Sequence, residues 1–293
     1  MRLALVGTGV MGRLHARTIA GNEWASLARV IEPRATAGLA CAAEFGADWA
    51  PSLDSLSDVD AVVLASATES HHELALEVLK QGKPLLVEKP VADELGAAEE
   101  IVQLAENLDV PVMCGFIERF NPAVLAAARL VDEPVHLIAQ RHGPYAPRIR
   151  TGVAWDLLVH DVDLAIRFLG EPARVASTAG YFHPRSAAGA EDAVDATLSC
   201  RTGMAMVSAS RLAQRKVRTV TITELDRVIE LDLLRREVVV VRESGPEAYP
   251  VVDREPLAAQ LDHFLDLAAG RIDAAAERAS ILPAHRVIAR VLS

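Results

Sequence analysis

A chain of 293 residues, of which 51% are hydrophobic, is long enough for two domains that each bury a core. Charged residues make up 24% of the chain and interrupt every apolar run before it reaches membrane-spanning length, so we expect no membrane partner. The net charge of −10 disfavours nucleic acid as a partner. The three cysteines lie far apart without metal-ligand spacing, which indicates reduced thiols, a cytoplasmic protein and no metal site.

Roughly the first 115 residues alternate short apolar segments with longer helical patterns, which is typical of a parallel α/β sheet. The predicted strands are almost continuously apolar, which suits strands that are covered on both faces. These strands are residues 2–6, 27–31, 61–66, 84–87 and 110–114, and helical patterns between them include residues 71–81 and 93–107. We therefore predict a doubly wound Rossmann sheet in a first domain of residues 1–117.

From residue 135 the pattern changes to short segments, several of which alternate apolar and polar residues as antiparallel strands do. The predicted strands are residues 135–141, 192–201, 219–223 and 229–233, and the long helical stretch among them is residues 154–169. We predict a second, α+β domain of residues 118–293 with a mostly antiparallel open sheet and a C-terminal helix that can return to the first domain. A sheet face buried between subunits predicts a homodimer or homotetramer.

A glycine-rich turn directly follows the first predicted strand and opens the first helix. In such a turn the first glycine permits the tight bend, the second lets backbone approach a pyrophosphate, and the third lets the helix pack on the strand. The helix N-terminus supplies free N–H groups to the phosphates. The sequence therefore predicts a dinucleotide site made by Gly7, Gly9, Val10, Met11 and Gly12.

Glu32 lies at the end of the second predicted strand, twenty positions beyond Gly12. An acidic residue at this place accepts hydrogen bonds from the adenosine ribose and repels the extra phosphate of NADP, so it favours NAD. Arg34 leaves NADP possible, because an arginine there can bind that phosphate.

Lys89, one of only four lysines, follows the predicted strand 84–87 in the tripeptide Glu88-Lys89-Pro90. Ligands of open α/β sheets bind beyond the carboxyl ends of the strands. A buried lysine loses its proton more readily than an arginine does. The position therefore favours a functional lysine, and a surface lysine in a turn is the alternative.

The helical stretch 154–169 carries a thin polar stripe on an otherwise apolar cylinder. At about 100° per residue, Asp156 and His160 share this stripe with Asp163 and Arg167. An aspartate four residues before a histidine can orient and charge-stabilise the imidazole. Oxidation of an alcohol requires a group that accepts its proton while hydride leaves, and such a histidine suits that role. A structural row of helix salt bridges is the alternative.

These motifs together resemble those of the glucose–fructose oxidoreductase/inositol dehydrogenase (Gfo/Idh/MocA) family over nearly the whole chain. The resemblance implies an oxidoreductase that acts on CH–OH groups, with Lys89, Asp156 and His160 as its catalytic group. It also places Glu88 and Lys89 at the cofactor, together with His71 at the mouth of the nicotinamide pocket.

Residues 116–122, 141–150 and 217–219 are similar to segments of UDP-N-acetylglucosamine 3-dehydrogenases within that family. Arginines and a tyrosine in these segments offer bidentate donors and a stacking ring to a diphosphate or uracil. The predicted substrate-binding residues are therefore Arg119, Tyr145, Arg148 and Arg150, together with Lys89, Asp156 and His160.

We therefore predict an NAD-dependent dehydrogenase that oxidises a ring hydroxyl, at C3, of a sugar such as UDP-N-acetylglucosamine or its uronic acid. An NADPH-dependent 3-ketosugar reductase of deoxysugar biosynthesis is the alternative that Glu32 disfavours and Arg34 leaves open. A non-catalytic NAD(H)-binding redox sensor is the alternative of another class. The complete catalytic set disfavours it, since a sensor needs only the dinucleotide-binding half.

Overall fold

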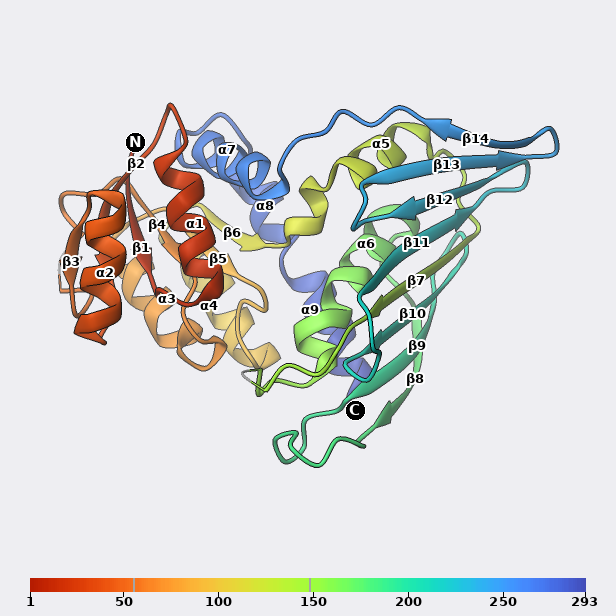
Figure 1. Cartoon of the computed structure of the whole chain (residues 1–293), viewed down its shortest axis with the longest axis horizontal. Helices are drawn as coiled ribbons and strands as arrows, with labels where there is room; N and C mark the ends of the chain where they lie inside the picture. The colour runs from red at the N-terminus through yellow and green to blue at the C-terminus, as the bar shows by residue number, and fades with distance from the viewer. Residues whose placement is uncertain (55, 148) are drawn as a thin grey trace. The chain divides into compact units, whose positions relative to one another are not determined.

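The computed structural model describes residues 1–54, 56–147 and 149–293, which form two compact units (Figure 1). Unit 1 comprises Met1–Gly115 and Leu257–Leu282, and unit 2 comprises Phe116–Pro256 and Pro283–Ser293. Within the described residues, no helix is both long enough and apolar enough to span a bilayer.

Unit 1 contains a six-stranded parallel sheet in the order β3-β2-β1-β4-β5-β6. The strands are β1 (Arg2–Val6), β2 (Ser26–Ile31), β3 (Asp48–Ala50), β4 (Ala61–Leu64), β5 (Leu85–Glu88) and β6 (Val112–Gly115). The strand order reverses between β1 and β4, and ligands of doubly wound sheets bind beyond the strand ends at such a switch point. The predicted Rossmann fold is confirmed, and the short edge strand β3 is an addition to it.

The strands of the Rossmann sheet are apolar because both faces are covered: every residue of β4, β5 and β6 is buried. The helices of this unit are α1 (Val10–Ala20), α2 (Ala35–Phe45), α3 (His71–Lys80), α4 (Leu95–Asn107), α7 (Pro256–Ala268) and α8 (Ala274–Ala279). Helix α8 packs against α4 and β6.

Unit 2 contains an eight-stranded sheet in the order β14-β13-β12-β11-β7-β10-β9-β8. The strands are β7 (His136–His142), β8 (Arg174–Gly180), β9 (Ala193–Ser199), β10 (Met204–Ser210), β11 (Val217–Thr223), β12 (Val228–Asp232), β13 (Glu237–Arg242) and β14 (Gly245–Tyr249). Only the pairing of β7 with β10 is parallel among the pairs that the structure describes, so the mostly antiparallel sheet is confirmed.

Helices cover one face of this sheet (Figure 1). They are α5 (Pro122–Leu130), which contacts β12 and β13, and α6 (Val159–Leu169), which contacts β7 and β10, and α9 (Leu282–Val291) follows at the C-terminus. Alternation along β7 buries Leu137 and Ala139 beneath the helices and leaves Ile138 exposed on the other face.

Candidate active site

The glycine-rich turn of unit 1 has the shape that a dinucleotide requires. Gly7 has a φ of 92°, and a Cβ there would lie 2.7 Å from the Cα of Ser66. A Cβ on Gly12 would collide with the carbonyl oxygen of Gly7, whereas a Cβ on Gly9 would meet nothing within 4 Å. Gly7 and Gly12 are thus required by packing, and Gly9 leaves open space beside the backbone.

This open space lies where α1 begins. Gly9 is the N-cap of α1 and provides no side-chain cap, so the N–H groups of the first turn, which holds Val10, Met11 and Gly12, are available to a ligand. A pyrophosphate fits such a site, because the backbone donors and the helix dipole both favour an anion. The residues present therefore fit the dinucleotide.

Glu32 has neighbours that the sequence motif did not reveal. Its buried carboxylate accepts hydrogen bonds from Thr8 N at 3.1 Å and Thr8 Oγ1 at 2.8 Å, and from Arg34 Nε at 2.7 Å. The hydrogen bond from Arg34 is the largest cause of a pKa of about 2 for Glu32, and Thr8 lowers it further against the opposing effect of burial. A ribose must therefore share or displace the exposed Arg34 side chain to reach this carboxylate.

Replacing Glu32 by Ala should weaken NAD binding roughly 10–100-fold, the effect of losing a charge-assisted hydrogen bond, and should erode the preference for NAD over NADP. In the native protein NAD affinity should stay constant as the pH falls from about 8 to 6, because a carboxyl with a depressed pKa remains ionised far below neutrality. Calorimetric titration with both cofactors measures this, with Arg34→Ala as the comparison. Tighter binding of NADP than of NAD by the native protein would reverse the assignment.

Lys89 follows β5 and is half-buried. The preceding residue, Glu88, is buried and its Oε1 lies 2.7 Å from Nε2 of His15, which comes from α1. This pair joins the strand that leads to Lys89 to the helix that starts at the glycine turn. His15 lies outside the predicted set, and the only signal for it was its spacing of one helical turn from the buried Gly12.

His71 is buried next to the segment that contains Lys89 and does not project toward solvent. It is 1% exposed, its Nδ1 lies 2.9 Å from the carbonyl oxygen of Pro90 and its Nε2 lies 3.3 Å from that of Ser66. Burial lowers the pKa of His71, and the two carbonyl contacts oppose this. These contacts support a role in holding the segments around Ser66 and Lys89, and a role at the mouth of the nicotinamide pocket stays a prediction.

The polar stripe of unit 2 does not lie on one regular helix. The predicted helix 154–169 consists of a π-helical turn, Ala154–Leu158, followed by α6. A π-turn places more residues in each turn than an α-helix does, so a spacing of 100° per residue is wrong for its first residues, including Asp156. Single π-turns are frequent at functional sites. His160 is buried at the start of α6, and Asp156 is half-buried.

Glu191 anchors the start of this π-turn. Its Oε1 accepts a hydrogen bond from Ala154 N at 2.6 Å, and its main-chain oxygen accepts bonds from Val153 N at 3.1 Å and from Arg211 Nη2 at 3.0 Å. A Cβ on Gly152 would collide with the Glu191 carboxylate, so glycine permits this close approach. A carboxylate at the N-terminal end of a helix also suits the helix dipole.

Replacing Glu191 by Ala should lower the free energy of unfolding by about 1–2 kcal/mol, because it removes a cap from a buried helix start. The control is Glu171→Ala, at an exposed position of the same unit, which should stay within about 0.5 kcal/mol of the native protein. Urea denaturation measures both values. Equal stability of the two variants would contradict the anchoring role.

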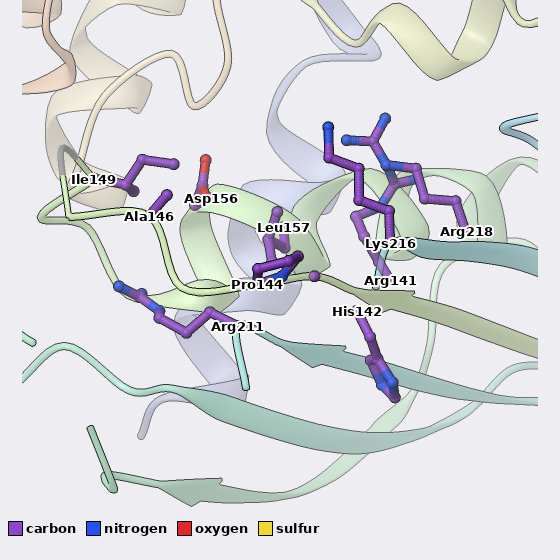
Figure 2. A pocket seen from close by; sticks show the side chains of 11 residues that line it. Arg141, His142, Pro144, Ala146, Ile149, Asp156, Leu157, Arg211, Lys216 and Arg218 are labelled. Atoms are coloured by element: carbon purple, nitrogen blue, oxygen red, sulfur yellow. The ribbon is translucent and has the colours of Figure 1, made fainter. Parts of the chain in front are cut away.

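A cavity of about 170 Å³ opens in unit 2 beside Asp156 (Figure 2). Four basic side chains are part of its lining, namely Arg141, Arg211, Lys216 and Arg218. Arg141 and Arg218 lie directly opposite each other on the paired strands β7 and β11. The cavity therefore brings one candidate catalytic carboxylate together with a group of cations.

Of the predicted substrate arginines, the two that the structure describes, Arg119 and Arg150, do not line this cavity. Arg119 is buried in a bidentate pair with Asp163, with distances of 2.9 Å and 2.6 Å, and its guanidinium lies 4.6 Å from the centre of the Phe116 ring. Arg150 is exposed and does not line the cavity as far as the structure describes it, and Arg148 lies outside the described residues. For Arg119 the geometry favours a structural role, because its donors already face a carboxylate.

Tyr145 lies between two residues of the cavity lining, Pro144 and Ala146. Its ring stacks on the His183 ring at 3.7 Å, and its hydroxyl donates to the carbonyl oxygen of Arg185 at 2.6 Å. Tyr145 is not part of the cavity lining that the structure describes, and its ring packs on the segment that contains His183 and Arg185.

Beneath the cavity, Arg141 joins two buried carboxylates. Its Nη2 donates to Asp161 Oδ1 and its Nη1 donates to Glu118 Oε1, both at 2.8 Å. Burial raises the pKa of Asp161 even though Arg141 opposes this. Burial would also raise the pKa of Glu118, but the charges of Arg141 and Arg218 hold it below its ordinary value. The network therefore holds the Arg141 side chain in one position in the cavity lining.

Comparison with known proteins gives a consistent result over the chain. The model of the oxidoreductase family with an NAD-binding Rossmann fold matches residues 1–116, and the model of the GFO/IDH/MocA C-terminal domain matches residues 128–224. The chain is 28% identical over 281 residues to a UDP-N-acetylglucosamine 3-dehydrogenase of Acidithiobacillus ferrooxidans, covering 91% of this chain and 88% of that protein. It is also 28% identical over 229 residues to an inositol 2-dehydrogenase of Rhizobium meliloti, covering 73% and 69% of the two chains.

Solved structures agree with this. The UDP-N-acetylglucosamine 3-dehydrogenase from Acidithiobacillus ferrooxidans superposes with a TM-score of 0.89 at 28% identity, covering 100% of this chain and 99% of that one. A levoglucosan dehydrogenase in complex with NADH has a TM-score of 0.84 at 17% identity, covering 99% and 96%, and shares the fold.

Proposed function

The chain belongs to the Gfo/Idh/MocA family of NAD-type sugar oxidoreductases, and from that premise we propose that it oxidises the C3 hydroxyl of a nucleotide-linked amino sugar. The observation that carries the proposal is the position of Asp156. This residue lies in the π-turn and lines the cation-rich cavity, and the π-turn leads directly into α6, where His160 lies. Membership of this dehydrogenase family also disfavours the alternative of a non-catalytic redox sensor.

The proposed chemistry converts a ring C–OH to C=O. NAD, when bound, supplies the acceptor for the hydride and its two electrons. His160 accepts the hydroxyl proton, Asp156 orients the imidazole and stabilises its charge, and Lys89 donates a hydrogen bond to the reacting oxygen. The glycine turn, Glu32 and the segment around Glu88 hold the cofactor. Each of these roles is part of the proposal.

One observation supports a nucleotide sugar over a free sugar: the relative that acts on UDP-N-acetylglucosamine aligns with 91% of this chain. The cavity volume of about 170 Å³ is below the ~300–1,000 Å³ of pockets that enclose a whole ligand. It therefore suits one sugar ring, with the nucleotide end on the rim.

The test is to follow NADH formation with UDP-N-acetylglucosamine, its uronic acid, other nucleotide sugars, free hexoses and inositol. We expect the nucleotide-linked amino sugars to react fastest, because contacts at both ends of a long substrate align its C3–H bond. Faster turnover of inositol or a free hexose would contradict the nucleotide-sugar substrate. The coarser conclusion, that the protein is a sugar oxidoreductase, would still stand. Exclusive reduction of a 3-ketosugar with NADPH would favour the reductase alternative.

We also propose that the protein is a homodimer or homotetramer that buries the open face of the unit 2 sheet. Ile138, Met204 and Met206 are 38%, 42% and 48% exposed on that face. Apolar side chains gathered on one sheet face favour a protein partner. Light scattering should give a dimer or tetramer mass, and a monomer at micromolar concentration would contradict the proposal.

A further inference from the structure

The cations of the unit 2 cavity differ in how far they are already balanced by carboxylates. Arg141 is paired with Asp161 and Glu118. Arg218 Nη1 lies 3.5 Å from Glu118 Oε1, a carboxylate that it shares with Arg141. Lys216 is exposed, and among the described residues no hydrogen bond or ion pair engages it. Positive charge at the cavity is therefore incompletely compensated, chiefly at Lys216.

Lys216 and Arg218 belong to one short stretch of chain at the start of β11. Lys216 directly precedes β11 and Arg218 is the second residue of that strand, and Figure 2 shows both side chains ending on the same side of the cavity. Burial, followed by the like charge of Arg141, lowers the pKa of Arg218. The charged form of Arg218 is thus less stable here than in water, and an anion beside it would restore part of that stability.

Arg211 adds a buried donor to the same cavity. Its side chain is 6% exposed, and Nε has no hydrogen-bond partner within the described residues, with the nearest carboxylate, Asp192, 3.6 Å away. Its Nη2 is used by the main-chain oxygens of Thr151 and Glu191. Arg211 is thus held by Asp192, Thr151 and Glu191, and it adds a further positive charge to the cavity lining.

We propose that Lys216 and Arg218 form an anion-binding subsite, which takes a carboxylate or phosphate attached directly to the sugar ring that reacts beside Asp156. The inference rests on the proposed function and narrows its substrate class. Because the cations and Asp156 line one cavity of about 170 Å³, the anion and the reacting hydroxyl belong to the same ring or to its immediate substituents. A uronic acid carboxylate and a phosphate on C1 both meet this requirement, and a neutral polyol does not.

The experiment compares Lys216→Gln and Arg218→Gln with the native protein. Arg215→Gln is the matched control, because Arg215 is an exposed cation next to Lys216 that does not line the described part of the cavity. The steady-state substrates are UDP-N-acetylglucosamine, glucuronate, glucose 1-phosphate and inositol. The equilibrium probe is inorganic phosphate, titrated calorimetrically into each protein.

We expect Lys216→Gln to raise KM about 10–100-fold for the anionic substrate, with kcat changed only a few-fold, and to leave inositol kinetics and NAD affinity unaltered. Phosphate binding should weaken by a similar factor, and Arg215→Gln should match the native protein. A KM effect confined to glucuronate identifies a carboxylate as the ligand, and one confined to the two phosphate esters identifies a phosphate.

Equal effects of Lys216→Gln on neutral and anionic substrates, or no effect on either, would overturn the subsite while leaving the dehydrogenase intact. If no sugar is oxidised but Lys216→Gln still abolishes phosphate binding, the proposed function fails and the anion subsite stands. The two proposals therefore fail separately.

Discussion

Replacing Lys89 by Met, or His160 by Asn, should lower turnover by roughly 10²–10⁴-fold, while NAD affinity stays nearly unchanged. The size of the effect is that of a lost acid–base group, since either change removes a donor or acceptor from the reacting hydroxyl in the proposed mechanism. NAD affinity should persist because the glycine turn and the N-terminus of α1, which are expected to hold the pyrophosphate, are untouched.

Steady-state kinetics on the true substrate, with calorimetric NAD binding alongside, measures both quantities. Lys80→Met and His72→Asn are controls, because Lys80 is exposed at the end of α3 and His72 pairs with Glu100 on the surface of unit 1. Both controls should retain native turnover. If the Lys89 and His160 variants also retain it, the polar residues of 154–169 are structural and the candidate active site is wrong.

Replacing Arg141 by Met should cost about 3–5 kcal/mol of the free energy of unfolding, because it leaves a buried carboxylate without its counter-charge. Asp161 is 1% exposed and receives three contacts from Arg141, at 2.8, 3.1 and 3.1 Å. Replacing Asp161 by Leu as well should recover much of the loss, since removing both charges avoids the unpaired ion.

The loss in Arg141→Met should be smaller at about pH 5 than at about pH 8. Burial raises the pKa of Asp161 and Arg141 opposes this rise, so removing Arg141 should raise the pKa further. A protonated Asp161 needs no counter-charge, so the stability lost in the variant should shrink as the pH falls. Urea denaturation at the two pH values measures the change. Arg235→Met, which breaks an exposed pair with Asp232, should cost no more than about 1 kcal/mol, and an equally small loss in Arg141→Met would contradict the network.

The fold was predictable because its strongest signals are local. The strands of unit 1 are buried on both faces, so their sequences are almost continuously apolar. In unit 2, β9 alternates apolar and polar residues because only one face of its sheet is covered. Edge strand β3 was not predicted from the sequence, because its three half-exposed residues are too few to show a periodic pattern. The π-turn at Ala154–Leu158 could not be predicted, since an α-helical spacing had to be assumed.

The candidate site was harder to predict because its contacts join distant segments. Arg141 and Arg218 belong to two segments that were singled out in the sequence, but only the register of β7 with β11 places them opposite each other. In the same way, the pair of His15 with Glu88 depends on how α1 packs on the sheet. Residue type and spacing predicted the glycine turn, and residue type alone singled out Asp156, whose assumed helical spacing was wrong. The partners of these residues are visible only in three dimensions.

The most direct test of the proposed activity uses UDP-N-acetylglucosamine that carries deuterium at C3. The protein is incubated with this substrate and NAD, and the reduced cofactor is analysed by mass spectrometry. Oxidation at C3 predicts that each NADH molecule carries one deuterium, because the hydride comes from that carbon. NADH without deuterium would contradict oxidation at C3. If UDP-N-acetylglucosamine gives no NADH while the same preparation oxidises inositol, the nucleotide-sugar substrate would be contradicted.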